Sequence, residues 1–110
     1  MNFVEPKDCR NYLWTSHAKR KLFQYSLTPN TVKRIVRYPD RKEVGIAEKT
    51  VAVMKDKSTK SVQKEVWVMY QIVKGKKKII SAWIYPGKTE PGAEIYVPDE
   101  VWEEIQNNQK

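Results

Sequence analysis

Residues 64–86 hold two runs of β-branched and aromatic residues, and the prediction for the rest of the chain is arranged around them. They read K-E-V-W-V-M-Y-Q-I-V-K-G-K-K-K-I-I-S-A-W-I-Y-P, with a tight Lys-Gly-Lys turn between the runs. This pattern predicts a β-hairpin. Both faces of each run carry apolar residues, which predicts the centre of an antiparallel sheet, covered on one side and partly covered on the other. In the second run, strict alternation puts Ile79, Ser81, Trp83 and Tyr85 on one face and Ile80, Ala82 and Ile84 on the other.

Two helical patterns precede these strands. The first spans about residues 16–25, where Ser16 is a good N-cap and the following residues favour helix. Its apolar stripe should pack on the sheet, and its polar stripe, with His17 in the first turn, should lie along the edge of that contact. The apolar stripe consists of Ala18, Leu22 and Tyr25, and the polar stripe of His17, Arg20, Lys21 and Gln24.

The second helix is predicted over about residues 29–37. Thr28 can cap this helix and Pro29 suits its first turn. Helical spacing turns its apolar residues inward and its basic residues outward, so the helix should present a basic stripe to solvent. The inward residues are Val32, Ile35 and Val36, and the outward ones are Lys33, Arg34 and Arg37.

The remaining segments are two strands and one helix. From residue 42 the apolar period becomes two, which predicts strands over about residues 42–47 and 50–55. Pro98-Asp99-Glu100 resembles a helix start, and it predicts a last helix of about residues 98–107. Residues 1–13 show little periodicity and are expected to be irregular.

These elements predict a single α+β domain over residues 1–110. Two N-terminal helices pack on a four-stranded antiparallel sheet within a core of residues 14–86, and an acidic C-terminal extension, residues 88–110, ends in the short helix. A chain of this length should bury roughly two-thirds of its unfolded surface, which is enough for one modest core.

Charge separates these two parts of the chain. Residues 1–89 hold 20 Lys or Arg against 7 acids, a balance of +13, and residues 90–110 hold one Lys against 6 acids, a balance of −5, which gives the net charge of +8. A basic body of this size indicates a polyanion partner, most simply nucleic acid. One alternative is a domain whose lysines only serve solubility. Another is contact with an anionic membrane surface, which is less favoured because no long basic amphipathic helix is present. The acidic extension should lie against the basic body or mark the contact with a partner.

Composition excludes several other classes. No run approaches the ~20 apolar residues of a membrane span, and the N-terminus lacks the apolar core of a signal peptide. One cysteine, Cys9, excludes an internal disulfide and fits the cytoplasm. One cysteine and one histidine cannot supply the four ligands of a structural zinc site, so no metal and no cofactor are expected.

His17 is the strongest candidate for chemistry. The dipole at a helix N-terminus disfavours the imidazolium by roughly 0.3–1 kcal/mol, and the neutral imidazole is the form that a general base needs. Lys21 lies one turn further on the same side. A base beside a fixed cation can cleave RNA without a metal, because the base activates a 2′-hydroxyl and the cation stabilises the phosphoryl oxygens. Tyr85 or Tyr70 would then act as the acid that protonates the leaving oxygen.

Other residues are candidates for holding the nucleic acid. Aromatic residues on the sheet, above all Trp83, could stack on an unpaired base, although at least half of these aromatic residues should be core. Lysine-rich turns beside such a sheet suit single-stranded RNA better than a DNA groove. The residues expected to hold phosphates are Arg20, Lys33, Arg34, Arg37 and Arg41.

The stretch T-S-H-A-K-R-K-L-F-Q-Y-S-L-T-P-N-T-V resembles the opening of a bacterial family of uncharacterised domains, domain of unknown function 4258. The later step from Val36 to Arg41 and the closing hairpin fit as well, so the resemblance spans about residues 14–86. That family is similar to the barnase/EndoU/colicin/RelE group, whose fold has two helices before a four-stranded antiparallel sheet. Within the motif His17 and Ala18 match, and Lys21 stands where the family has arginine.

The resemblance implies a RelE-like ribonuclease toxin, acting on RNA with or without the ribosome and paired with an acidic antitoxin protein. We therefore predict a metal-independent endoribonuclease with His17 as base and Lys21 as electrostatic stabiliser. One alternative is a catalytically inactive module of the same fold that binds RNA or a protein. The other is a scaffold domain without a nucleic-acid partner.

Overall fold

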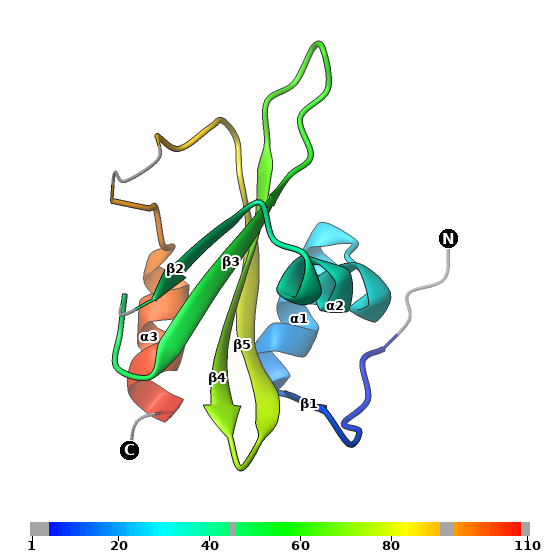
Figure 1. Ribbon diagram of the computed structural model, residues 1–110, viewed down its shortest axis with the longest axis vertical. Coiled ribbons are helices and arrows are strands. Elements are labelled where there is room, and N and C mark those ends of the chain that lie inside the picture. Colours follow the sequence, from blue (N-terminus) through cyan, green and yellow to red (C-terminus); the bar gives the residue numbers. More distant parts are fainter. Residues whose placement is uncertain (1–4, 45, 91–93, 109–110) are drawn as a thin grey trace.

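The computed structural model describes residues 5–44, 46–90 and 94–108, which form three helices and one five-stranded sheet (Figure 1). The predicted α+β class is confirmed. In chain order the elements are β1 (Tyr12–Trp14), α1 (Ser16–Tyr25), α2 (Pro29–Arg37), β2 (Arg41–Val44), β3 (Thr50–Asp56), β4 (Glu65–Val73), β5 (Lys76–Tyr85) and α3 (Asp99–Asn108).

The sheet differs from the prediction at one edge. Its strand order is β1-β5-β4-β3-β2, and β1 runs parallel to β5 with Trp14 opposite Ile79, whereas the other three pairs are antiparallel. The prediction of four antiparallel strands, with residues 1–13 irregular, was therefore wrong in this detail. A strand of three residues is too short to show a period of two, and its partner strand, β5, lies far along the chain.

The predicted hairpin of β4 and β5 is confirmed at the centre of the sheet. Lys74 and Gly75 have φ angles of +51° and +79°, the left-handed conformations that a tight two-residue hairpin turn requires. Beyond the turn, Tyr70 pairs with Ile79 but Met69 pairs with Ser81, so Ile80 is an extra residue in β5, a β-bulge.

This bulge corrects the predicted faces of β5. Ile79 lies in the same core cluster as Ala82, with Ile84 packed against it, whereas Ile80 lies with Trp83 in the other cluster. Strict alternation had put Ile79 with Trp83 and Ile80 with Ala82. The inserted residue changes the phase of the strand by one position, which moves every side chain on one side of the bulge to the other face.

Two hydrophobic cores follow from this sheet, one on each face. Helices α1 and α2 cover the first core, to which they contribute Ala18, Leu22, Val32, Ile35 and Val36. Helix α3 covers the second core through Val101 and Ile105, which pack in one cluster with Trp67 and Trp83. Figure 1 shows α1 and α2 on one side of the strands and α3 on the other. The prediction that the second face is only partly covered underestimated how much of it is buried.

The helix bounds match the sequence pattern closely, with one change at the start of α1. Thr15, not Ser16, is the N-cap, and its side chain accepts a hydrogen bond from the backbone N–H of Ala18. Thr28 caps α2 in the same way and Pro29 is its first residue, as predicted. Strand β2 is shorter than predicted and ends at Val44, the last residue before a position outside the described residues. In the described part of the chain, no helix is long and apolar enough to cross a bilayer.

Candidate functional site between α1 and α3

Thr15 fixes the start of α1 against the edge of β5. Its backbone N–H donates to the carbonyl of Ile79 at 3.2 Å, and its hydroxyl donates to the carbonyl of Ile80 at 3.0 Å. The same hydroxyl oxygen accepts from Ala18, so one side chain both caps the helix and ties it to the strand. The chain thereby passes from β1 into α1 along β5, and the first turn of α1 comes to lie over that strand.

His17 is held at this junction and is only 6% exposed. Its Nε2 atom lies 2.9 Å from the hydroxyl oxygen of Ser81 on β5, and its Nδ1 atom lies 4.0 Å from Oε2 of Glu104 on α3. Burial lowers the pKa of His17; Lys21 and Arg20 act in the same direction, and the Glu104 carboxylate opposes them. The imidazole is therefore neutral at neutral pH, and burial is the largest cause.

Lys21 lies one turn further along α1 and is also buried, with 5% of its surface exposed. Its ammonium group donates to Oε1 of Gln24 at 2.9 Å and forms an ion pair with the carboxylate of Glu100 on α3. The charge of Lys21 is therefore compensated by the C-terminal helix. The expectation that the acidic extension lies against the basic body is confirmed by this contact.

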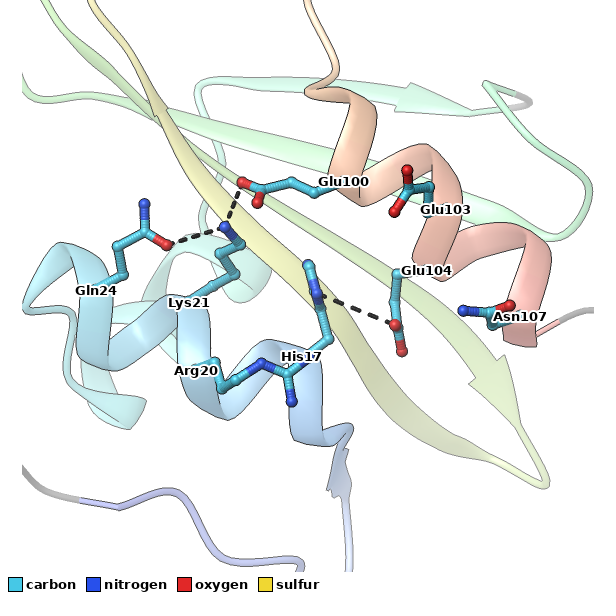
Figure 2. A pocket seen from close by; sticks show the side chains of 8 residues that line it. All are labelled: His17, Arg20, Lys21, Gln24, Glu100, Glu103, Glu104 and Asn107. Atoms are coloured by element: carbon cyan, nitrogen blue, oxygen red, sulfur yellow. Dashed lines mark hydrogen bonds and ion pairs between the residues drawn. The ribbon is translucent and has the colours of Figure 1, made fainter.

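The space between α1 and α3 forms a pocket of about 440 Å³. Figure 2 shows side chains of α1 reaching toward those of α3, with the Lys21–Glu100 and His17–Glu104 contacts between them. The lining carries two cationic side chains and three carboxylates beside the neutral imidazole, so it is slightly acidic. Its residues are His17, Arg20, Lys21, Gln24, Glu100, Glu103, Glu104 and Asn107.

The chemistry available in this pocket is proton transfer by His17 beside a charge-compensated lysine. Ser81 is fully buried, so its hydroxyl orients the imidazole and has no access to a substrate as a nucleophile. Among the described residues, no cluster of three or more His, Cys, Asp or Glu side chains could hold a metal ion.

Neither predicted acid lies in this pocket. Tyr70 is 5% exposed and packs in the core under α1 and α2, where burial raises the pKa of its hydroxyl. Tyr85 packs beside the opposite core, with its ring centroid 5.9 Å from that of Tyr96. The two tyrosines lie on opposite faces of the sheet, and neither is among the residues that line the pocket with His17.

Two residues predicted to contact RNA, Trp83 and Arg41, pack against other side chains of the protein. Trp83 is 1% exposed and stacks on Trp67 with centroids 6.1 Å apart, which leaves no ring face for a base. Arg41 donates hydrogen bonds of 2.7 Å to Glu43 and Thr89, and its guanidinium lies 5.7 Å from the Trp67 ring centroid. Arg41 therefore has a structural role next to the second core, and its contact with a phosphate stays a prediction. Base stacking on Trp83 was wrong, because the ring is buried.

Three of the other predicted cations, Lys33, Arg34 and Arg37, share one surface on α2, whereas Arg20 lines the α1–α3 pocket. We call the surface on α2 the α2 basic patch; its residues are Asn30, Lys33, Arg34, Arg37 and Tyr38. These residues line a second pocket, of about 260 Å³, whose lining contains three cationic side chains and no carboxylate. Lys33 lies 5.3 Å from the centroid of the Tyr12 ring, and Tyr38 is 66% exposed. Asn30 and Tyr38 were missed from the sequence, although both flank the basic stripe.

The acidic side of the α1–α3 pocket was also missed as part of a site.

Comparison with protein-family models, with curated proteins and with solved structures found no match for this chain. The resemblance to the uncharacterised bacterial family and to the RelE-like ribonucleases thus stays a prediction, and we infer the function from the two pockets.

Proposed function

We propose that this protein binds single-stranded RNA through the α2 basic patch. The observation that carries the proposal is the second pocket, in which Lys33, Arg34 and Arg37 surround an open surface without a carboxylate. Phosphate groups provide most of the affinity of such sites, because each neutralised phosphate releases condensed counterions. The exposed ring of Tyr38 adds a surface on which an unpaired base can stack, which favours a single strand over a duplex.

The position of α2 supports this use. Its apolar residues are buried against β3 and β4, so the opposite side of the helix is held facing solvent. Arg34 and Arg37 lie in its last turn, where the helix dipole stabilises cations. The patch is therefore a cationic surface on a folded helix, and binding RNA requires little ordering of the backbone.

Substitution of Arg34 and Arg37 tests the proposal. Both residues are exposed and neither is part of the core, so Arg34→Gln/Arg37→Gln should leave the fold intact. A matched control, Lys57→Gln/Lys60→Gln, removes the same charge from an exposed loop. Affinity for a labelled oligouridylate is measured by fluorescence anisotropy over a range of salt concentrations, with a single-stranded DNA of the same length beside it.

The patch variant should bind RNA at least about tenfold more weakly than the control, and its dependence of log K on log salt should be shallower by about 0.7 for each lost phosphate contact. Equal losses in the two variants would show that the net charge, rather than the patch, attracts RNA. Equal affinity of the natural chain for RNA and DNA would assign the patch to single strands in general.

A second function, metal-independent RNA cleavage at His17, is favoured by one observation. The neutral imidazole of His17 lines the same pocket as Lys21 and Arg20. One helix thus supplies a base and two cations to one site. In this proposal the protein is a RelE-like endoribonuclease whose antitoxin partner is acidic. Incubation of RNA in chelator should yield cyclic-phosphate ends, and His17→Ala should lower their rate of formation by about 10²-fold or more. Uncut RNA at saturating protein would refute the cleavage proposal and leave the binding proposal standing.

A further inference from the structure

Helix α3 sets the charge of the α1–α3 pocket. It brings Glu100, Glu103 and Glu104 to the side of the pocket that faces Lys21 and Arg20 (Figure 2). Without these carboxylates the lining would hold two cationic side chains and a titratable imidazole, which is the composition of an anion site. With them the lining carries one more negative than positive charge.

We propose that α3 is an intramolecular phosphate mimic, whose carboxylates take the positions beside Lys21 and His17 that phosphates of a bound strand would occupy. The α1 surface is then a second polyanion site that α3 keeps closed. The proposal rests on the proposed RNA-binding function, because it names the same ligand and adds the control of a second contact surface.

The chemistry of the contacts supports this reading. A carboxylate and a phosphate both accept charge-assisted hydrogen bonds from an ammonium group, so the Glu100–Lys21 pair has the form of a phosphate contact. The pair is formed between a buried ammonium and a carboxylate whose side chain is 51% exposed. Only the carboxylate of this pair is solvated, so loss of Glu100 leaves the buried ammonium of Lys21 without an anionic partner. A phosphate of a bound strand would restore that partner.

The opposite side of α3 holds these carboxylates in place. Val101 and Ile105 are 0% and 2% exposed in the second core, so the helix is anchored by apolar contacts that do not involve the pocket. The charges can therefore be removed without removing the anchor. This separation makes the closed state testable by neutral substitutions in the full chain.

The test compares two variants that lose the same charge. Glu100→Gln/Glu104→Gln removes carboxylates from the pocket, and Glu90→Gln/Glu94→Gln removes two exposed carboxylates that do not line it. Binding of the labelled oligouridylate is measured as a function of salt. The pocket variant should bind at least about tenfold more tightly than the control, and its salt dependence should be steeper by about 0.7 for each added phosphate contact.

Adding Lys21→Gln to each variant identifies the surface responsible. The gain of the pocket variant should disappear in this background, because the released contact is that of Lys21. A gain that survives there, or an equal gain in the two carboxylate variants, would overturn the phosphate-mimic proposal while leaving the α2 basic patch untouched. If neither the natural chain nor any variant binds RNA, both proposals fall.

Folding of the variants is checked separately. Should Glu100→Gln/Glu104→Gln lose the near-ultraviolet circular dichroism of its buried tryptophans, the single substitution Glu104→Gln replaces it, since the Lys21–Glu100 pair then remains. That variant should bind at least about threefold more tightly than Glu94→Gln, because it opens the position beside His17 while the Lys21 contact stays closed. Equal binding by these two single variants would count against the proposal in the same way.

Discussion

Ile105→Ala measures how firmly α3 is attached to the sheet. Ile105 is 2% exposed and packs in the second core with Trp67 and Trp83. The substitution removes three carbon groups from this core, each worth about 0.8 kcal/mol of transfer free energy, or about 2.4 kcal/mol together. The cavity left behind adds to this loss, so we expect the free energy of unfolding to fall by about 2.5–4 kcal/mol.

Urea unfolding followed by tryptophan fluorescence measures this change, with Gln106→Ala as the control. Gln106 is exposed on the same helix, so its substitution should change the unfolding free energy by less than about 0.5 kcal/mol. A loss below about 1 kcal/mol for Ile105→Ala would refute the assignment of α3 as an anchored layer of the fold. It would also weaken the case for carboxylates held at fixed positions in the pocket.

Two further predictions concern stability. Burial holds the pKa of His17 in the folded state below its usual 6.5, so the unfolded state binds the proton first as the pH falls. The contribution of the neutral imidazole to the free energy of unfolding is therefore fully present above about pH 6.5 and is lost as the pH falls from there through the folded pKa. His17→Gln should reduce the change of the unfolding free energy between about pH 7 and pH 5, measured by urea unfolding at each pH. The same dependence on pH in the variant and in the natural chain would contradict a neutral buried imidazole. Gly75→Ala should lower Tm by about 4 °C, because a Cβ at φ +79° meets no neighbouring atom but strains the backbone by about 1 kcal/mol. Calorimetry beside Lys76→Ala checks this, and equal Tm values for the two would disprove a left-handed requirement at the turn.

The helices and the central hairpin were predictable because their signals are local. The apolar stripes of α1 and α2 repeat within one or two helical turns. Thr28 and Pro29 mark the start of α2, and Lys74-Gly75 marks the hairpin turn. Such signals depend on residues a few positions apart, and their physical basis is the same in the sequence and in the structure.

Features that depend on distant residues were not predictable in this way. The bulge at Ile80 arises from pairing between two strands, and β1 is stabilised by β5 rather than by its own sequence. The buried state of His17 requires Ser81 and Glu104, which come from two other elements. A charge count indicated two oppositely charged parts of the chain, but it could not place particular carboxylates beside Lys21.

The separation between Lys21 and Glu100 along the chain has a consequence for biosynthesis. The two residues are 79 positions apart, so at about 5–20 residues per second the ribosome needs roughly 4–16 s to add Glu100 after Lys21. Ser81, the partner of His17, also follows 64 positions later. A nascent chain therefore carries Lys21 without its carboxylate partner for several seconds beside ribosomal RNA, and the pocket is completed only when the last helix has been translated.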